Sequence, residues 1–190
     1  MKDMVKLGGL LMLITVIAAT ALAAVYKVTK PRILEQKRLV LERALLLALP
    51  GADKTAIVPV KKGDQILYYK GYANPDTTKF VGYAFVAHGP GYSSVIETMV
   101  GVDSTGKIIG LKVMSQTETP GLGSRVEQIK HGAKTPWFQD QFRNRKAEKL
   151  AVDKDGGEIQ SITGATISSR ALTKSIVAGY KLLKKEISQN

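Results

Sequence analysis

The sequence predicts an α+β domain, in which helices pack on an antiparallel sheet, carried on one N-terminal transmembrane helix. Three observations predict this class. An uncharged apolar run lies near the start, strand-like alternation fills the middle, and a helical apolar periodicity occupies the end. Strands followed by a helix are typical of α+β domains. We therefore expect an anchor (1–27), a helical stalk (28–50) and one folded domain (51–190).

The expected anchor is the uncharged run of 20 residues from Leu7 to Tyr26, bounded by Lys6 and Lys27. A helix needs about 20 apolar residues to cross a hydrocarbon layer about 30 Å thick. The segment Ala21-Leu22-Ala23 resembles a signal-peptide cleavage site, so a cleaved signal peptide is the alternative. Because the apolar run continues past that site, we expect an uncleaved single-pass anchor.

Basic residues flank this span unevenly. Two lysines precede it, and five basic residues follow it closely, namely Lys27, Lys30, Arg32, Lys37 and Arg38. Taken alone, the positive-inside bias therefore places the large domain in the cytoplasm.

The stalk, Val28 to Leu49, shows apolar residues at helical spacing, with Pro31 near its start and Pro50-Gly51 ending it. From about Ala56 onward the pattern is that of strands. Segments 94–103 and 107–115 flank the turn candidate Asp103-Ser104-Thr105-Gly106, which predicts an antiparallel hairpin.

The remaining segments are helical or mixed. Val126 to Phe142 suggests a helical piece on each side of Pro136, and Ile167 to Ile187 is an amphipathic helix. The two histidines, His88 and His131, are expected in loops without a catalytic role.

Composition excludes several kinds of chemistry. The chain has no cysteine, which excludes cysteine-ligated iron–sulfur clusters, disulfides and a thiol nucleophile. With two histidines, we expect neither a metal site nor a catalytic triad. The net charge of +12 favours an acidic partner, an anionic lipid surface or nucleic acid. We expect a membrane partner and no nucleic acid.

The segment from Ser161 to Arg170 is the most informative one, because five of its ten residues carry hydroxyls and it precedes the terminal helix. The first turn of a helix presents free N–H groups, and small residues let a ligand approach them, so this segment suits a phosphate. An ordinary Ser or Thr N-cap is the alternative. No G-x-G-x-x-G or phosphate-loop lysine is present, so a dinucleotide or nucleoside triphosphate is not indicated.

Thr163-Gly164-Ala165-Thr166, followed by Ile167-Ser168-Ser169, resembles the flavinylation motif of the covalent FMN-binding domain family. This family includes the G subunit of the Rnf ion-translocating ferredoxin:NAD oxidoreductase and the C subunit of the sodium-translocating NADH:quinone oxidoreductase. The loop Glu118–Gly123 and the segment Pro136-Trp137-Phe138 also resemble the family pattern, as does Gly91-Tyr92. The resemblance covers the whole chain and is closer to the Rnf protein.

The resemblance implies FMN bound through its phosphate, as a phosphoester, to the hydroxyl of Thr166. It implies a wider cofactor site formed by Thr163, Gly164, Ala165, Ser168, Ser169, Glu118, Thr119, Gly121, Leu122 and Trp137. Trp137 is expected beside the isoalloxazine, and Gly123 is expected to leave room for it. One departure is Gln160, which stands where the family usually has an aspartate thought to help the transferase recognise the site.

By the same resemblance the chain is a non-catalytic electron relay of an ion-translocating ferredoxin:NAD oxidoreductase complex. Its implied partners are other membrane subunits and, during maturation, a flavin transferase that uses FAD. The family places the FMN domain on the extracytoplasmic side of the cytoplasmic membrane, and we follow the family over the charge bias. The alternatives are a non-redox membrane-anchored adhesin or lipid-binding module, and a flavin carrier in another electron-transfer chain.

Overall fold

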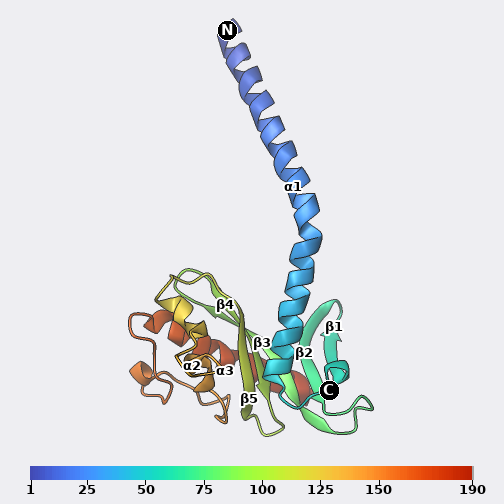
Figure 1. The fold of residues 1–190 in the computed structure, drawn as a ribbon, viewed down its shortest axis with the longest axis vertical. Coiled ribbons are helices and arrows are strands. Elements are labelled where there is room, and N and C mark those ends of the chain that lie inside the picture. The colour runs from blue at the N-terminus through green and yellow to red at the C-terminus, as the bar shows by residue number, and fades with distance from the viewer. Residues whose placement is uncertain (190) are drawn as a thin grey trace. The chain divides into compact units, whose positions relative to one another are not determined.

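The computed structural model describes residues 1–189 and divides into two compact units, Met1–Val40 and the chain from Leu41 onward. One helix, α1 (Lys2–Ala48), runs through the first unit and into the second (Figure 1). Pro31 lies inside it without ending it, whereas the sequence predicts Pro31 near the start of a separate stalk helix. The divisions at residues 27 and 50 stay predictions.

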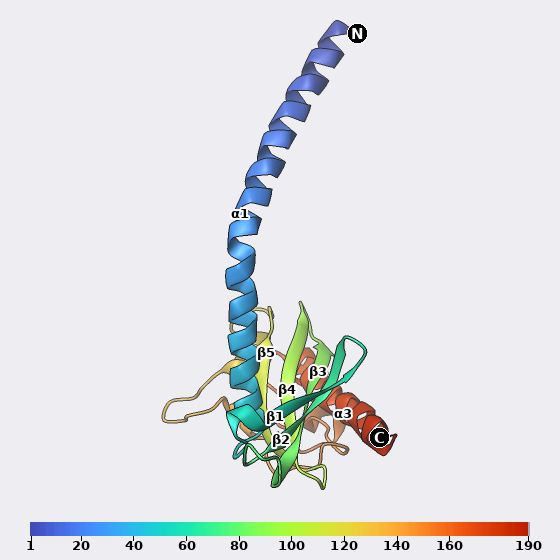
Figure 2. The same ribbon diagram turned by 90° about the vertical axis from the view of Figure 1, so that its right-hand side faces the viewer.

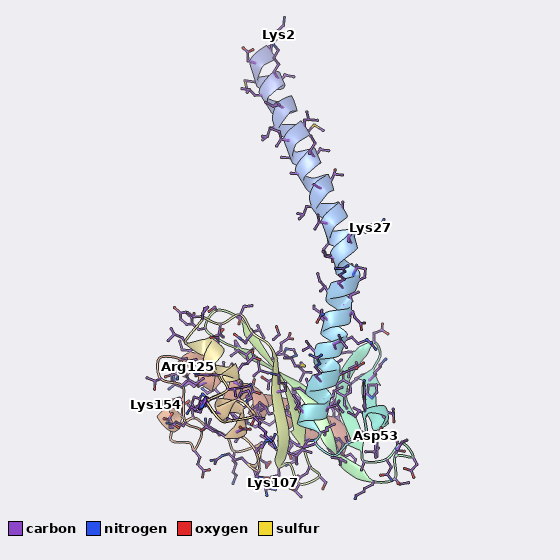
Figure 3. All side chains as sticks on the ribbon, viewed as in Figure 1. Lys2, Lys27, Asp53, Lys107, Arg125 and Lys154 are labelled. Carbon is purple, nitrogen blue, oxygen red and sulfur yellow. The ribbon has the colours of Figure 1, made fainter. Side chains whose placement is uncertain are left out.

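The first unit carries the apolar run. Its side chains from Leu7 to Tyr26 are exposed, and the helix is long and apolar enough to cross a membrane by length and composition. Figure 3 labels Lys2, near the start of the helix, and Lys27, which directly follows this run. The structure therefore supplies one candidate span among the described residues.

The second unit is built on a five-stranded antiparallel sheet in the order β1-β2-β3-β4-β5. The strands are β1 (Ile57–Lys62), β2 (Gln65–Tyr72), β3 (Phe80–Pro90), β4 (Val95–Val102) and β5 (Ile108–Ser115). Each strand pairs with the next along the chain, which confirms the α+β class. The β4–β5 turn forms as predicted, because the Asp103 carboxylate accepts hydrogen bonds from Thr105 and Lys107 and Gly106 has φ +77°.

Both faces of the sheet are covered. The long helix α3 (Thr166–Ser188) lies on one face, with Leu172, Ile176 and Leu183 in the larger core cluster. The last turns of α1 cover the other face, where Ala44, Ala48 and Leu49 pack with residues such as Met99 (Figure 2). β4 is consequently buried along most of its length.

Shorter elements complete the unit. They are the 3-10 helices Lys54–Ala56, Gly123–Glu127 and Asp153–Asp155, and the one-turn helix α2 (Trp137–Asp140). Asp53, which precedes the first of these, and Lys154, inside the third, are labelled in Figure 3. The helical pieces expected on each side of Pro136 are thus much shorter than the segment from Val126 to Phe142.

The expected loop position of His88 is wrong. His88 lies in β3, opposite Glu97 of β4, with its Nδ1 3.8 Å from the Glu97 Oε1. His-Gly-Pro-Gly resembles a turn locally, but β3 continues through Gly89 and Pro90, because that stretch pairs with the start of β4. His131 lies in a turn, as expected.

Candidate functional site

A cavity of about 580 Å³ lies where α3 begins. Three segments that are distant in sequence line it: Tyr92 from the β3–β4 turn, part of the loop 118–123 after β5, and residues 164–168. The loop leads into the 3-10 helix Gly123–Glu127, in which Figure 3 labels Arg125. The antiparallel meander and the helix packed on it bring these segments together.

The N-terminus of α3 has no side-chain cap. Its N-cap residue is Ala165, so the alternative of an ordinary Ser or Thr cap is wrong. The Ala165 N–H donates to the Ile162 carbonyl at 2.8 Å. The next three N–H groups, of Thr166, Ile167 and Ser168, have no hydrogen-bond acceptor among residues 1–189. They form the positive end of a 23-residue helix and open on the cavity.

Glu118 is the polar centre of the site. The residue is 4% exposed, and its carboxylate accepts five hydrogen bonds. The backbone N–H groups of Tyr92, Ser93 and Ser94 donate at 2.9–3.0 Å, and the Ser94 hydroxyl donates at 3.0 Å. The Ser168 hydroxyl of α3 donates at 2.5 Å. One carboxylate therefore ties together all three segments that line the cavity.

This environment keeps Glu118 ionised. Burial raises the pKa of Glu118, but the hydrogen bonds, led by the one from Ser168, outweigh burial and lower the pKa to about 2. Five neutral donors stabilise the negative charge of the carboxylate, which the ionised Glu118 keeps.

We predict that Glu118 makes the fold acid-sensitive. A carboxyl whose pKa falls from 4.5 in the unfolded chain to about 2 in the folded chain stabilises the fold above pH 4.5. That contribution, about 3 kcal/mol, is lost as the pH falls from about 5 to about 2. Denaturant unfolding across this range should show a shallower loss in Glu118→Gln than in the wild type. Asp64→Asn, in an exposed turn, is the control, and parallel curves for Glu118→Gln and wild type would contradict the prediction.

The loop after Glu118 is a tight turn. The Leu122 N–H donates to the Thr119 carbonyl at 3.1 Å, and Gly121 has φ +75°, as expected for Pro120-Gly121 at the centre of a type II turn. The turn presents Leu122, which is 44% exposed, to the cavity. Gly121 itself is part of the turn and does not line the cavity.

Gly123 has a second reason to be glycine, besides the one expected. A Cβ there would lie 2.5 Å from the Ser168 Oγ and 2.7 Å from a Glu118 carboxylate oxygen. Its lack of a side chain therefore makes room for the Glu118–Ser168 pair, besides opening the cavity wall.

Seven of the predicted site residues line the cavity: Glu118, Thr119, Leu122, Gly164, Ala165, Thr166 and Ser168. Thr163 is exposed beside it, and Gly164 has φ +79°. Ser169 is buried behind the cavity, where its hydroxyl accepts from the Ile162 N–H and donates to the Ala165 carbonyl, both at 3.0 Å. Ser169 thus holds the bend before α3 and does not line the cavity.

Trp137 does not line the cavity. It begins α2, packs against the larger core cluster and makes an edge contact with Phe138 at 5.8 Å. The Lys130 Nζ lies 4.1 Å from the centre of its ring. Sequence reasoning missed Tyr92 and Ile167, which do line the cavity. They are 71% and 51% exposed, which is a property of the packed chain, so no signal in the sequence alone identifies them.

The residues present fit a flavin phosphate. Three free N–H groups and a helix N-terminus suit a phosphate, and the Thr166 hydroxyl, on a half-buried residue, stands among them. Tyr92, Leu122 and Ile167 offer apolar surface for a flat ring system, and the cavity has the volume of a small-molecule site.

Comparison with known proteins gives the same assignment. The family model of the FMN-binding domain matches residues 91–181, and that of the RnfG N-terminal region matches residues 1–46. The chain is 33% identical to the G subunit of the proton-translocating ferredoxin:NAD(+) oxidoreductase complex of Clostridium ljungdahlii, over 84% of this chain and 80% of that protein. It is 33% identical to the G subunit of the Na(+)-translocating ferredoxin:NAD(+) oxidoreductase complex of Acetobacterium woodii, over 92% and 89%.

A solved structure shares the fold. The C subunit of the Na(+)-translocating NADH-quinone reductase from Parabacteroides distasonis superposes with a TM-score of 0.59, at 20% identity, over 80% of this chain and 94% of that chain.

Proposed function

The chain belongs to the family of G subunits of ion-translocating oxidoreductase (Rnf) complexes, and from this premise we propose that it is an electron-transfer protein carrying covalent FMN. The observation that supports covalent attachment most directly is the Thr166 hydroxyl, which stands at an uncapped helix N-terminus and lines the cavity. The cavity also lies within the matched FMN-binding region.

In this proposal the Thr166 Oγ forms a bond to the phosphorus of the FMN half of FAD. The phosphoanhydride bond breaks, AMP leaves and the hydroxyl proton is released. The N–H groups of Thr166, Ile167 and Ser168 hold the resulting phosphodiester, which keeps one negative charge. FMN supplies one- and two-electron redox chemistry when bound. The protein's own residues then bind, orient and shield it.

A flavin transferase is the proposed partner during maturation. Gln160, at the position where the family usually has an aspartate, precedes the motif Thr163–Thr166. Its backbone is held by the Gln141 side chain, which accepts from the Gln160 N–H at 2.8 Å and donates to the Gln160 carbonyl at 3.1 Å. These bonds use the backbone of Gln160, so they form whatever side chain stands at that position. The other subunits of the complex are the proposed partners in electron transfer.

We further propose that α1 spans the cytoplasmic membrane once, with the FMN domain on the extracytoplasmic side. The long apolar helix and the match to the RnfG N-terminal region support the anchor. Because the chain has no cysteine, a single cysteine at the exposed Lys130 can be labelled in intact cells by a maleimide that does not cross membranes. Labelling only after lysis would contradict the proposed side.

The test of the proposed function is the flavin content of the purified full chain. Protein made together with an active flavin transferase should be yellow and stay fluorescent after denaturation. Peptide mapping should find the flavin on the peptide that contains Thr166. Colourless protein would favour the adhesin or lipid-binding alternative, and flavin on another peptide would contradict the proposed linkage.

A further inference from the structure

Tyr92 is an exposed aromatic residue at a cavity. Its side chain lines the cavity at the start of α3, yet the residue is 71% exposed. Among the described residues that line this cavity, it is the one aromatic side chain. Together with the exposed Leu122 and Ile167, which line the same cavity, the ring forms an apolar surface of the kind that a ligand covers.

We propose that Tyr92 stacks on the isoalloxazine of the bound flavin, and that Glu118 positions Tyr92 for this contact. The inference rests on the proposed function, because it names a contact of the proposed FMN. It assigns to Tyr92 the place beside the flavin ring that the sequence predicts for Trp137.

The backbone that carries Tyr92 is fixed. The N–H groups of Tyr92, Ser93 and Ser94 all donate to the Glu118 carboxylate. The Gly91 N–H donates to the Ser94 carbonyl at 2.8 Å, which closes the turn. The direction of the tyrosine Cα–Cβ bond is therefore set by its hydrogen-bonded backbone, while the ring itself is exposed.

Only glycine fits before the tyrosine. A Cβ at Gly91 would lie 2.6 Å from the Glu118 Oε1 and 2.8 Å from the Ser94 carbonyl oxygen. The two residues of the Gly91-Tyr92 pair therefore have separate roles. Gly91 leaves room for the Glu118 carboxylate, and Tyr92 lines the cavity.

The other walls suit a flat ring. Leu122 and Ile167, which are 44% and 51% exposed, line the same cavity from the loop after β5 and from α3. An aromatic ring system in contact with Tyr92, Leu122 and Ile167 would remove their apolar surface from water. Trp137 offers no such surface to the cavity, since it packs on the core beneath Lys130.

The test uses flavin fluorescence in the full chain loaded with FMN. A phenol in contact with an excited flavin quenches its fluorescence by donating an electron that then returns, whereas a phenyl ring stacks without quenching. We expect Tyr92→Phe to raise the fluorescence yield several-fold and to lengthen the lifetime, with flavin content unchanged. Tyr72→Phe, on β2 and outside the cavity, and Trp137→Phe should leave both unchanged.

Each outcome decides between explanations. After denaturation all variants should fluoresce alike, which shows that the difference depends on the folded contact. Wild-type fluorescence in folded Tyr92→Phe, or an increase in Trp137→Phe instead, would overturn the assignment of Tyr92. A wild-type protein without flavin would defeat the proposed function rather than this inference.

The positioning role of Glu118 has its own readout. Glutamine at this position keeps the shape of the side chain but cannot accept all five hydrogen bonds, so the Tyr92 turn should loosen. We expect Glu118→Gln to show two lifetimes, one quenched and one long. A single quenched lifetime, identical to that of wild type, would remove Glu118 from the proposal.

Discussion

Thr166→Ala should contain no covalent flavin, even when it is made together with an active flavin transferase. The proposed phosphoester needs the Thr166 Oγ, and alanine has no oxygen to supply. The residue is half-buried and its hydroxyl has no hydrogen-bond partner among residues 1–189, so the fold should tolerate the change. We expect the free energy of unfolding of the flavin-free protein to change by less than about 0.5 kcal/mol. Intact mass measures the flavin, and thermal unfolding confirms the fold.

Two controls make this loss specific. Thr166→Ser retains a hydroxyl at the same helix N-terminus and should still acquire flavin. Thr163→Ala removes a hydroxyl from the same motif, but Thr163 is exposed and does not line the cavity, so flavin content should match wild type. Covalent flavin in Thr166→Ala would show that the acceptor is another residue.

Gly101→Ala should destabilise the sheet domain strongly. Gly101 of β4 pairs directly with Gly110 of β5, and the last turn of α1 lies against this bare backbone. A Cβ at Gly101 would stand 1.8 Å from the Ala48 carbonyl oxygen, and one at Gly110 would stand 2.1 Å from the Leu47 carbonyl oxygen. These are backbone atoms, which cannot rotate aside as a side chain can, so the helix end has to move.

We expect a loss of about 3 kcal/mol, which lowers the melting temperature of a domain of this size by roughly 10 °C. The measurement is thermal unfolding of the full chain in detergent. Gly9→Ala is the matched control, because a Cβ at Gly9 meets nothing within 4 Å. Equal melting temperatures for Gly101→Ala and wild type would mean that the helix end does not lie on these glycines in solution.

The elements that sequence analysis predicts correctly are those with local causes. The β4–β5 turn follows from Asp103 and Gly106, the first and last residues of a four-residue turn sequence. The type II turn follows from Pro120-Gly121, and α3 follows from its own apolar periodicity. In each case the decisive interactions connect residues a few positions apart, so the pattern in the sequence contains them.

Only part of the candidate site has such local causes. Thr166 and its small neighbours can be identified from the sequence, because they lie on one short segment. The Glu118 hydrogen bonds cannot, since the donors are 24 to 50 residues away along the chain. Sequence reasoning prefers Trp137 to Tyr92 for the same reason, because which aromatic side chain faces the cavity depends on how the strands and helices pack.

The sequence by itself determined the long apolar helix, the antiparallel hairpin, the terminal helix and the hydroxyl-rich segment at its start. Each rests on hydrogen bonds or apolar spacing within one segment. The tertiary structure decided that Ala165 leaves that helix uncapped, that Glu118 joins three distant segments, and that His88 belongs to a strand. Those features depend on burial and on partners that only the packed chain brings within hydrogen-bonding distance.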